Sequence, residues 1–154
     1  VFPGLLFNLG FTGQREKKLL INIECESHNY EYEPEKPIIQ KFNVFTQIFA
    51  PSPSILLSMK TVAVLERGKG RDYYDFIFLS GIADPDFGYL EARFGINNLT
   101  NLHDRILESC HETDFKRKSR DFEKLVFDQA ESQKVLFFKE YIQQNYKLNP
   151  KLKE

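Results

Sequence analysis

The stretch LSMKTVAVLERGKGRDYYDFIFLSG, from Leu57 to Gly81, departs most clearly from the pattern of a simple buried core. Its charged residues lie at fixed offsets inside an otherwise apolar run: Lys60, Arg67, Arg71, Asp72 and Asp75. An unpaired charge among apolar side chains is costly. These residues therefore need partners within the fold or a ligand, and the two glycines at 68 and 70 divide them between two segments.

Both segments have the features of helices. Ser52 and Pro53 are typical of a helix start, with serine as N-cap and proline in the first turn. The apolar positions that follow have helical spacing: Ile55, Leu56, Met59, Val62, Ala63 and Leu65. Gly68 and Gly70 end this helix. Arg71–Leu79 is expected to form a second helix, which Gly81 and Pro85 stop.

Residues after Pro85 continue the helical pattern. Phe87–Phe94 and Leu99–Cys110 each predict one helix, and Phe122–Tyr146 predicts one or two amphipathic helices with an aromatic stripe. The charged run Glu112–Arg120 is typical of a solvated helix face or a linker, with a nucleic-acid-binding patch as the alternative.

The N-terminal third has the features of strands. Leu5–Phe11 is short and apolar, Lys18–Ser27 alternates with period two, and Lys41–Ala50 is rich in aromatic and β-branched residues. Strands followed by helices indicate an α+β fold. We expect residues 1–51 to form the β-strand part and residues 52–154 the helical part.

Composition limits the class of protein. The 154 residues are 42% hydrophobic and carry a net charge of -1, so a packed core is expected and a global attraction to nucleic acid is not. Two cysteines without CxxC spacing fit a reducing compartment, and no apolar run approaches the roughly 20 residues of a membrane span. We therefore expect a cytoplasmic protein. Because the sequence begins with valine, we also expect it to start partway through a larger protein.

The charges of the two central helices each allow two interpretations. Lys60 lies at the edge of the apolar stripe, where it either extends to solvent or faces a phosphate. Asp72 stands at a helix start, where N-capping alone would explain it. Asp75 lies among aromatic residues and needs a partner such as Lys60, Arg67 or Arg71. The structural alternative to a functional site is a salt bridge that ties the two helices together.

Other carboxylates are candidate metal ligands. Alternation places Asn22, Glu24 and Glu26 on one face of the Lys18–Ser27 strand, where they either face water or contribute to a metal or substrate site. Asp84 and Asp86 form a D-x-D pair that could hold magnesium, although ordinary turn chemistry explains Asp-Pro-Asp equally.

The ordered set APSPSILLSMKTVAVLERGKGRDYYDFIFL resembles the nucleotidyltransferase AbiEii/AbiGii toxin family. That family has a strand, then a helix that opens near a proline or serine and carries a lysine, then an arginine, then R-D-x-x-D followed by a hydrophobic residue. Here these features correspond to Lys60, Arg67 and the segment Arg71–Asp75. The strong part of the match covers about thirty residues, and with weaker flanks it extends over Leu19–Gly95.

The resemblance implies a polymerase-β-like nucleotidyltransferase fold. It implies transfer of a nucleotide from a nucleoside triphosphate to an acceptor such as tRNA or protein, with Mg²⁺ as cofactor and an antitoxin as a possible partner. Lys60 and Asp72 would be catalytic, and Lys60, Arg67 and Arg71 would bind the nucleotide. Asp75 would form a structural ion pair, and Glu24 would occupy the third-carboxylate strand position as a metal ligand.

Two features depart from the family's pattern. The Gly-Ser loop with following carboxylates, which holds the metal in the family, is not found ahead of the strand that begins at Lys18, and asparagine stands at position 22. We therefore expect the C-terminal portion of a longer enzyme. The alternative is a non-catalytic interaction module, or an inactive fragment, in which the same charges only tie two helices together.

Overall fold

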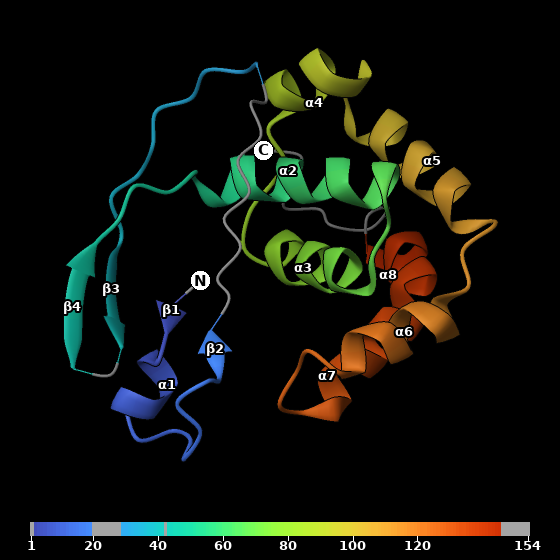
Figure 1. Cartoon of the computed structure of the whole chain (residues 1–154). Helices are drawn as coiled ribbons and strands as arrows, with labels where there is room; N and C mark the ends of the chain where they lie inside the picture. The colour runs from blue at the N-terminus through green and yellow to red at the C-terminus, as the bar shows by residue number, and fades with distance from the viewer. Residues whose placement is uncertain (1, 20–28, 42, 146–154) are drawn as a thin grey trace.

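The structure, a computed structural model, describes residues 2–19, 29–41 and 43–145 (Figure 1). The described chain is mostly helical, with short antiparallel strand pairs towards its N-terminal end. The predicted order of strands before helices is confirmed in part, because the described strands precede the helices after residue 52 but one short helix lies between the first two strands. None of the described helices is long and apolar enough to cross a membrane.

The first segment combines two very short strands with a short helix. Strand β1 (Phe2–Pro3) pairs with β2 (Lys18–Leu19) in antiparallel register. The prediction of a strand over Leu5–Phe11 is wrong, because Leu5–Asn8 forms helix α1. Gly4 adopts the left-handed conformation at φ 71°, and its carbonyl accepts the Asn8 N–H at 2.9 Å. Apolarity alone could not exclude a helix in so short a run.

A second pair of strands forms a hairpin before the helices. Strands β3 (Ile38–Lys41) and β4 (Val44–Gln47) are antiparallel, and Ile38 is opposite Gln47. The predicted strand over Lys41–Ala50 is confirmed only in part, because the chain reverses next to Asn43, whose φ is 62°. For the strand predicted over Lys18–Ser27, only the first two residues are described, as β2. Its three polar candidates at 22, 24 and 26 lie outside the described residues.

The helices follow the predicted boundaries closely up to residue 110. Their bounds are α2 (Pro53–Glu66), α3 (Gly70–Ser80), α4 (Phe87–Phe94) and α5 (Leu99–Cys110). The predicted N-cap is confirmed, since the Ser52 side chain accepts the Ile55 N–H at 3.3 Å. Side chains also cap α4 and α5, through Asp86 and Asn98. Local capping chemistry therefore fixes where these helices begin.

The C-terminal region differs from the predicted helices. It contains α6 (Phe115–Glu123), α7 (Gln129–Gln133), a 3₁₀ turn η1 (Lys134–Phe137) and α8 (Phe138–Asn145). Most of the charged run is confirmed as part of a helix, because α6 begins at Phe115, but Phe122 lies in the last turn of that helix instead of beginning the next. Asp128 caps α7 through the Ala130 N–H, so a new helix begins there.

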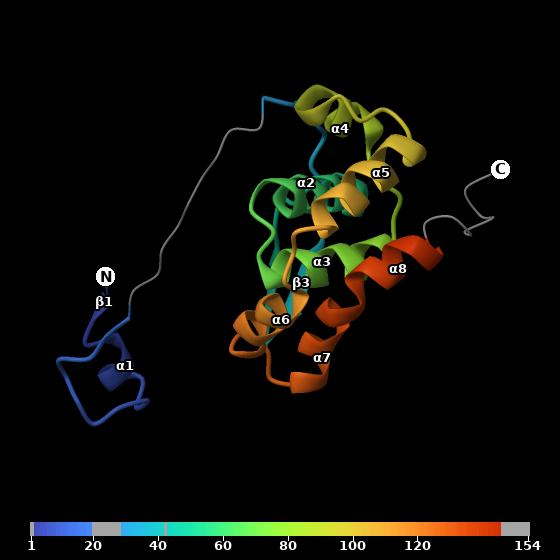
Figure 2. The ribbon, with the colours of Figure 1, turned by 90° about the vertical axis from the view of Figure 1, so that its right-hand side faces the viewer.

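Helix α2 lies at the centre of the helical part, and α3 packs along it (Figures 1 and 2). Helices α4 and α5 contact α2, while α6 and η1 contact α3. The core includes the fully buried side chains of Leu57, Phe76, Tyr89, Leu102 and Phe138. The Phe138 ring meets those of Tyr73 and Phe76 edge to face, at 4.7 and 5.5 Å between centroids. This core holds α2 and α3 in place relative to each other and so positions their charges.

Candidate functional site

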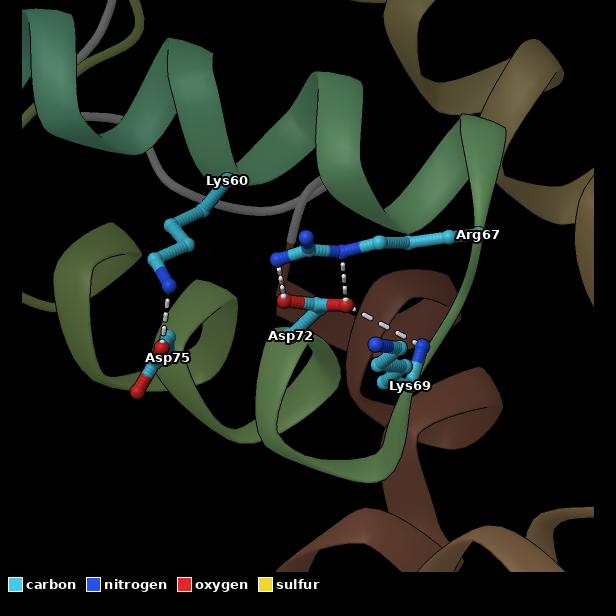
Figure 3. Close-up of polar contacts among 5 residues, drawn as sticks. All are labelled: Lys60, Arg67, Lys69, Asp72 and Asp75. Atoms are coloured by element: carbon cyan, nitrogen blue, oxygen red, sulfur yellow. Dashed lines mark hydrogen bonds and ion pairs between the residues drawn. The ribbon is translucent and has the colours of Figure 1, made fainter. Parts of the chain in front are cut away.

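The charged residues of the opening stretch meet where α2 turns back into α3. Arg67 is the C-cap of α2, and Gly68 follows with φ 48°, a conformation that glycine adopts readily. A Cβ atom at Gly68 would also crowd the Tyr73 hydroxyl. The short connection returns the chain at once, so α3 runs back along α2 and faces it with its acidic residues (Figure 3).

Asp72 is fully buried, and its hydrogen bonds come from residues of this turn (Figure 3). Its Oδ2 and Oδ1 accept hydrogen bonds from Arg67 Nε at 3.0 Å and Arg67 Nη2 at 2.8 Å. Oδ2 also accepts the Lys69 backbone N–H at 3.1 Å, which satisfies a donor at the start of α3. Asp72 thus caps one helix and binds the arginine that ends the other.

These contacts decide the ionisation of Asp72. Burial alone would raise the pKa of its carboxyl, but the hydrogen bonds from Arg67 and Lys69 and the charges of Arg67 and Lys60 outweigh burial and lower it. The carboxylate therefore stays ionised at neutral pH although no part of it is exposed.

This lowered pKa predicts acid sensitivity. A carboxyl with a lower pKa in the folded state adds stability above its unfolded pKa of about 3.9, and that stability is lost as pH falls through the folded pKa. We expect the free energy of unfolding to fall as pH drops from about 5 to 2. Denaturant unfolding followed by circular dichroism would measure this. A fall of the same size in Asp72→Asn would contradict the assignment to Asp72.

A second ion pair joins the same two helices one turn further along. Lys60 Nζ lies 2.6 Å from Asp75 Oδ2, and their side chains are 28% and 35% exposed (Figure 3). The sequence analysis included Lys60 among the possible partners of Asp75, and this pairing is confirmed. In water-accessible positions such a pair contributes little to stability, so the Lys60 ammonium can exchange one anion for another at low cost.

A depression of about 200 Å³ lies over α2 beside these pairs. Its lining residues are Met59, Lys60, Val62, Ala63, Glu66, Arg67 and Arg93. Three of them are cations, and Arg93 Nη2 lies 3.5 Å from Glu66 Oε1. Arg93 was missed by the sequence reasoning, because nothing in the last turn of α4 indicates that it reaches α2.

Arg71 does not join this depression. The sequence grouped it with Lys60 and Arg67 as a nucleotide-binding residue, but its exposed side chain lines a different groove, described below. One position along a helix turns a side chain by about 100°. Asp72 faces α2, and its neighbour Arg71 therefore faces elsewhere.

The D-x-D pair serves the local fold. Asp86 Oδ1 accepts the Tyr89 N–H at 2.7 Å as the N-cap of α4 and also accepts the Tyr30 hydroxyl at 3.1 Å. Ser54 Oγ donates to the Asp84 carbonyl at 2.7 Å, which ties this loop to α2. This is the turn chemistry that was the alternative to magnesium binding. Within residues 2–19, 29–41 and 43–145, no group of three His, Cys, Asp or Glu side chains could hold a metal ion, and the predicted ligand Glu24 lies outside them.

The described site is therefore a paired set of charges on two helices with a cation-lined depression at its side. Comparison of the chain with protein-family models, curated proteins and solved structures finds no match in any of the three.

Proposed function

We propose that this chain is part of a nucleotidyltransferase of toxin–antitoxin type, with the α2 depression as its triphosphate-binding surface. The observation that carries the proposal is the convergence of Lys60, Arg67 and Arg93 on one depression. Two of these three cations belong to the ordered set that resembles the AbiEii/AbiGii family. The finer fold that the resemblance implies, a polymerase-β-like sheet ahead of α2, belongs to the same proposal.

The chemistry assigned to these residues is electrostatic. An acceptor hydroxyl of tRNA or protein would form a new bond to the α-phosphorus, and the bond to the leaving pyrophosphate would break. Negative charge then grows on the leaving oxygens, where a fixed cation is most useful. Lys60 would exchange Asp75 for a phosphate oxygen. Arg67 would contribute its charge to the same surface, and Asp72, which holds the guanidinium in place, would be a positioning residue.

Magnesium, which the resemblance implies, does not fit the described residues. Both oxygens of Asp72 accept hydrogen bonds from Arg67, Asp75 contacts Lys60, and Asp86 caps α4. Among the residues that the structure describes, these carboxylates do not belong to any group of three His, Cys, Asp or Glu side chains that could hold a metal ion. We therefore assign no step to a metal ion, and the described residues are given only phosphate binding and orientation.

Replacing Lys60 tests the proposal. We expect Lys60→Ala to weaken binding of nucleoside triphosphates about tenfold, the loss of one charge-assisted contact of roughly 1.4 kcal/mol. Calorimetric titration of each nucleoside triphosphate measures the change. Lys116→Ala, which removes an exposed lysine outside the depression, is the matched control. Equal weakening by both variants would contradict a specific site.

A second candidate is a non-catalytic interaction module. It is favoured because Lys60 and Arg67 each have a carboxylate partner within the fold, so neither charge requires a ligand. In that case the charges only tie α2 to α3. Absence of nucleotide binding at millimolar concentration, together with unchanged antitoxin binding in Lys60→Ala, would support this alternative over the enzyme.

A further inference from the structure

A second concave site lies between the start of α3 and α6. It is a groove of about 370 Å³, and its lining residues are Lys69, Gly70, Arg71, Lys118, Asp121, Phe122 and Leu125. None of these residues lines the α2 depression. The helices approach closely here because Gly70 has no side chain. A Cβ atom there would overlap the Lys118 carbonyl oxygen and lie 2.8 Å from the Phe122 Cβ.

The charge of this groove is not balanced within the fold. Three cations line it, Lys69, Arg71 and Lys118, against the single carboxylate of Asp121. None of the three cations has a carboxylate within ion-pair distance among the residues that the structure describes. Lys60 and Arg67, by contrast, are both paired. The positive charge of the groove between α3 and α6 is therefore less neutralised than that of the α2 depression, and it attracts an anion more strongly.

The remaining lining is apolar. The Leu125 side chain is 66% exposed, whereas Phe122 is only 6% exposed and packs its ring against Tyr74 at 5.0 Å between centroids. The volume is at the lower end of the range for small-molecule sites, about 300–1,000 Å³. A ligand that combines a phosphate with an apolar group therefore suits this lining.

We propose that the α3–α6 groove binds a nucleoside phosphate. The phosphate lies against Lys69, Arg71 and Lys118, and the base lies over Leu125. This site is separate from the triphosphate-binding surface proposed on α2 and does not depend on it. Its ligand has two possible sources, a free nucleotide or the phosphorylated end of a strand. The exposed cations Lys116 and Arg117 on α6 would contact further phosphates only in the second case.

Titration with 5′-AMP tests the groove. We expect the double variant Arg71→Gln/Lys118→Gln to weaken AMP binding at least tenfold. The matched double variant Lys116→Gln/Arg117→Gln removes the same charge from α6 outside the groove and should change it less than twofold. Asp121→Asn should tighten binding, because it removes the one lining carboxylate. Lys60→Ala should leave it unchanged, which separates failure of this site from failure of the α2 proposal.

Three outcomes would overturn the inference. They are absence of AMP binding at millimolar concentration, equal weakening by the two double variants, and binding of inorganic phosphate as tight as that of AMP. A 5′-phosphorylated decanucleotide identifies the source. Tighter binding than AMP that depends on Lys116 and Arg117 indicates a strand end, whereas equal binding indicates a free nucleotide, and either result supports the groove.

Discussion

Asp72→Ala is expected to lower the free energy of unfolding by about 3 kcal/mol, because it removes two charge-assisted hydrogen bonds and a helix cap at once. Asp72 is fully buried, and its oxygens accept from Arg67 at 2.8 and 3.0 Å and from the Lys69 N–H at 3.1 Å. The Arg67 side chain is 45% exposed, so it can turn to water after the change. This keeps the loss below that of breaking a wholly buried pair. Urea unfolding at neutral pH measures the effect.

Asp75→Ala is the matched control on the same helix. Its ion pair with Lys60 is shorter, at 2.6 Å, but both side chains are about one-third exposed. We expect a loss of less than about 1 kcal/mol, since water solvates both charges once they separate. Equal losses for the two variants would show that burial is not what distinguishes Asp72. Asp72→Asn, which keeps an oxygen for the Lys69 N–H, should fall between them.

The helices from α2 to α5 were predictable because their end signals are local. The Ser52 cap with Pro53, and the stops at Gly68 and Gly81, operate over a few residues and can be recognised in the sequence. The strand predicted over Leu5–Phe11 failed for the opposite reason. Its apolar residues suit either structure, and the left-handed Gly4 next to it decided for a helix.

Helical spacing in the sequence predicted only those parts of the candidate site that lie on α2 and α3. The spacing of Lys60, Arg67, Asp72 and Asp75 placed charges on facing helices, and the structure pairs all four. The 100° turn between neighbouring helix positions also separates Arg71 from Asp72 once Asp72 is known to face α2. The spacing could not show that Arg93 of α4 reaches the same depression, because this depends on the angle between packed helices, which side chains distant in the sequence determine.

Gly70→Ala is expected to destabilise the protein by about 3 kcal/mol, at the upper end of the usual cost of overpacking. The added Cβ would overlap the Lys118 carbonyl oxygen, which is backbone and cannot rotate away, and would lie 2.8 Å from the Phe122 Cβ. The start of α3 must then move away from α6, and the groove changes shape with it. Thermal and urea unfolding measure the loss.

Gly81→Ala, at the other end of α3, provides the control. Gly81 has φ -79° and ψ -13°, which alanine adopts readily, and its nearest neighbour to a new Cβ is the Phe78 carbonyl oxygen at 3.4 Å. We expect no loss, or a gain of up to about 1 kcal/mol from the reduced freedom of the unfolded chain. If Gly70→Ala were equally harmless, α3 and α6 could not be as close as described. The close contact between α3 and α6 that forms the groove would then be absent. The site proposed there would lose its physical basis, because Arg71 and Lys118 can face the same ligand only if their helices are in contact.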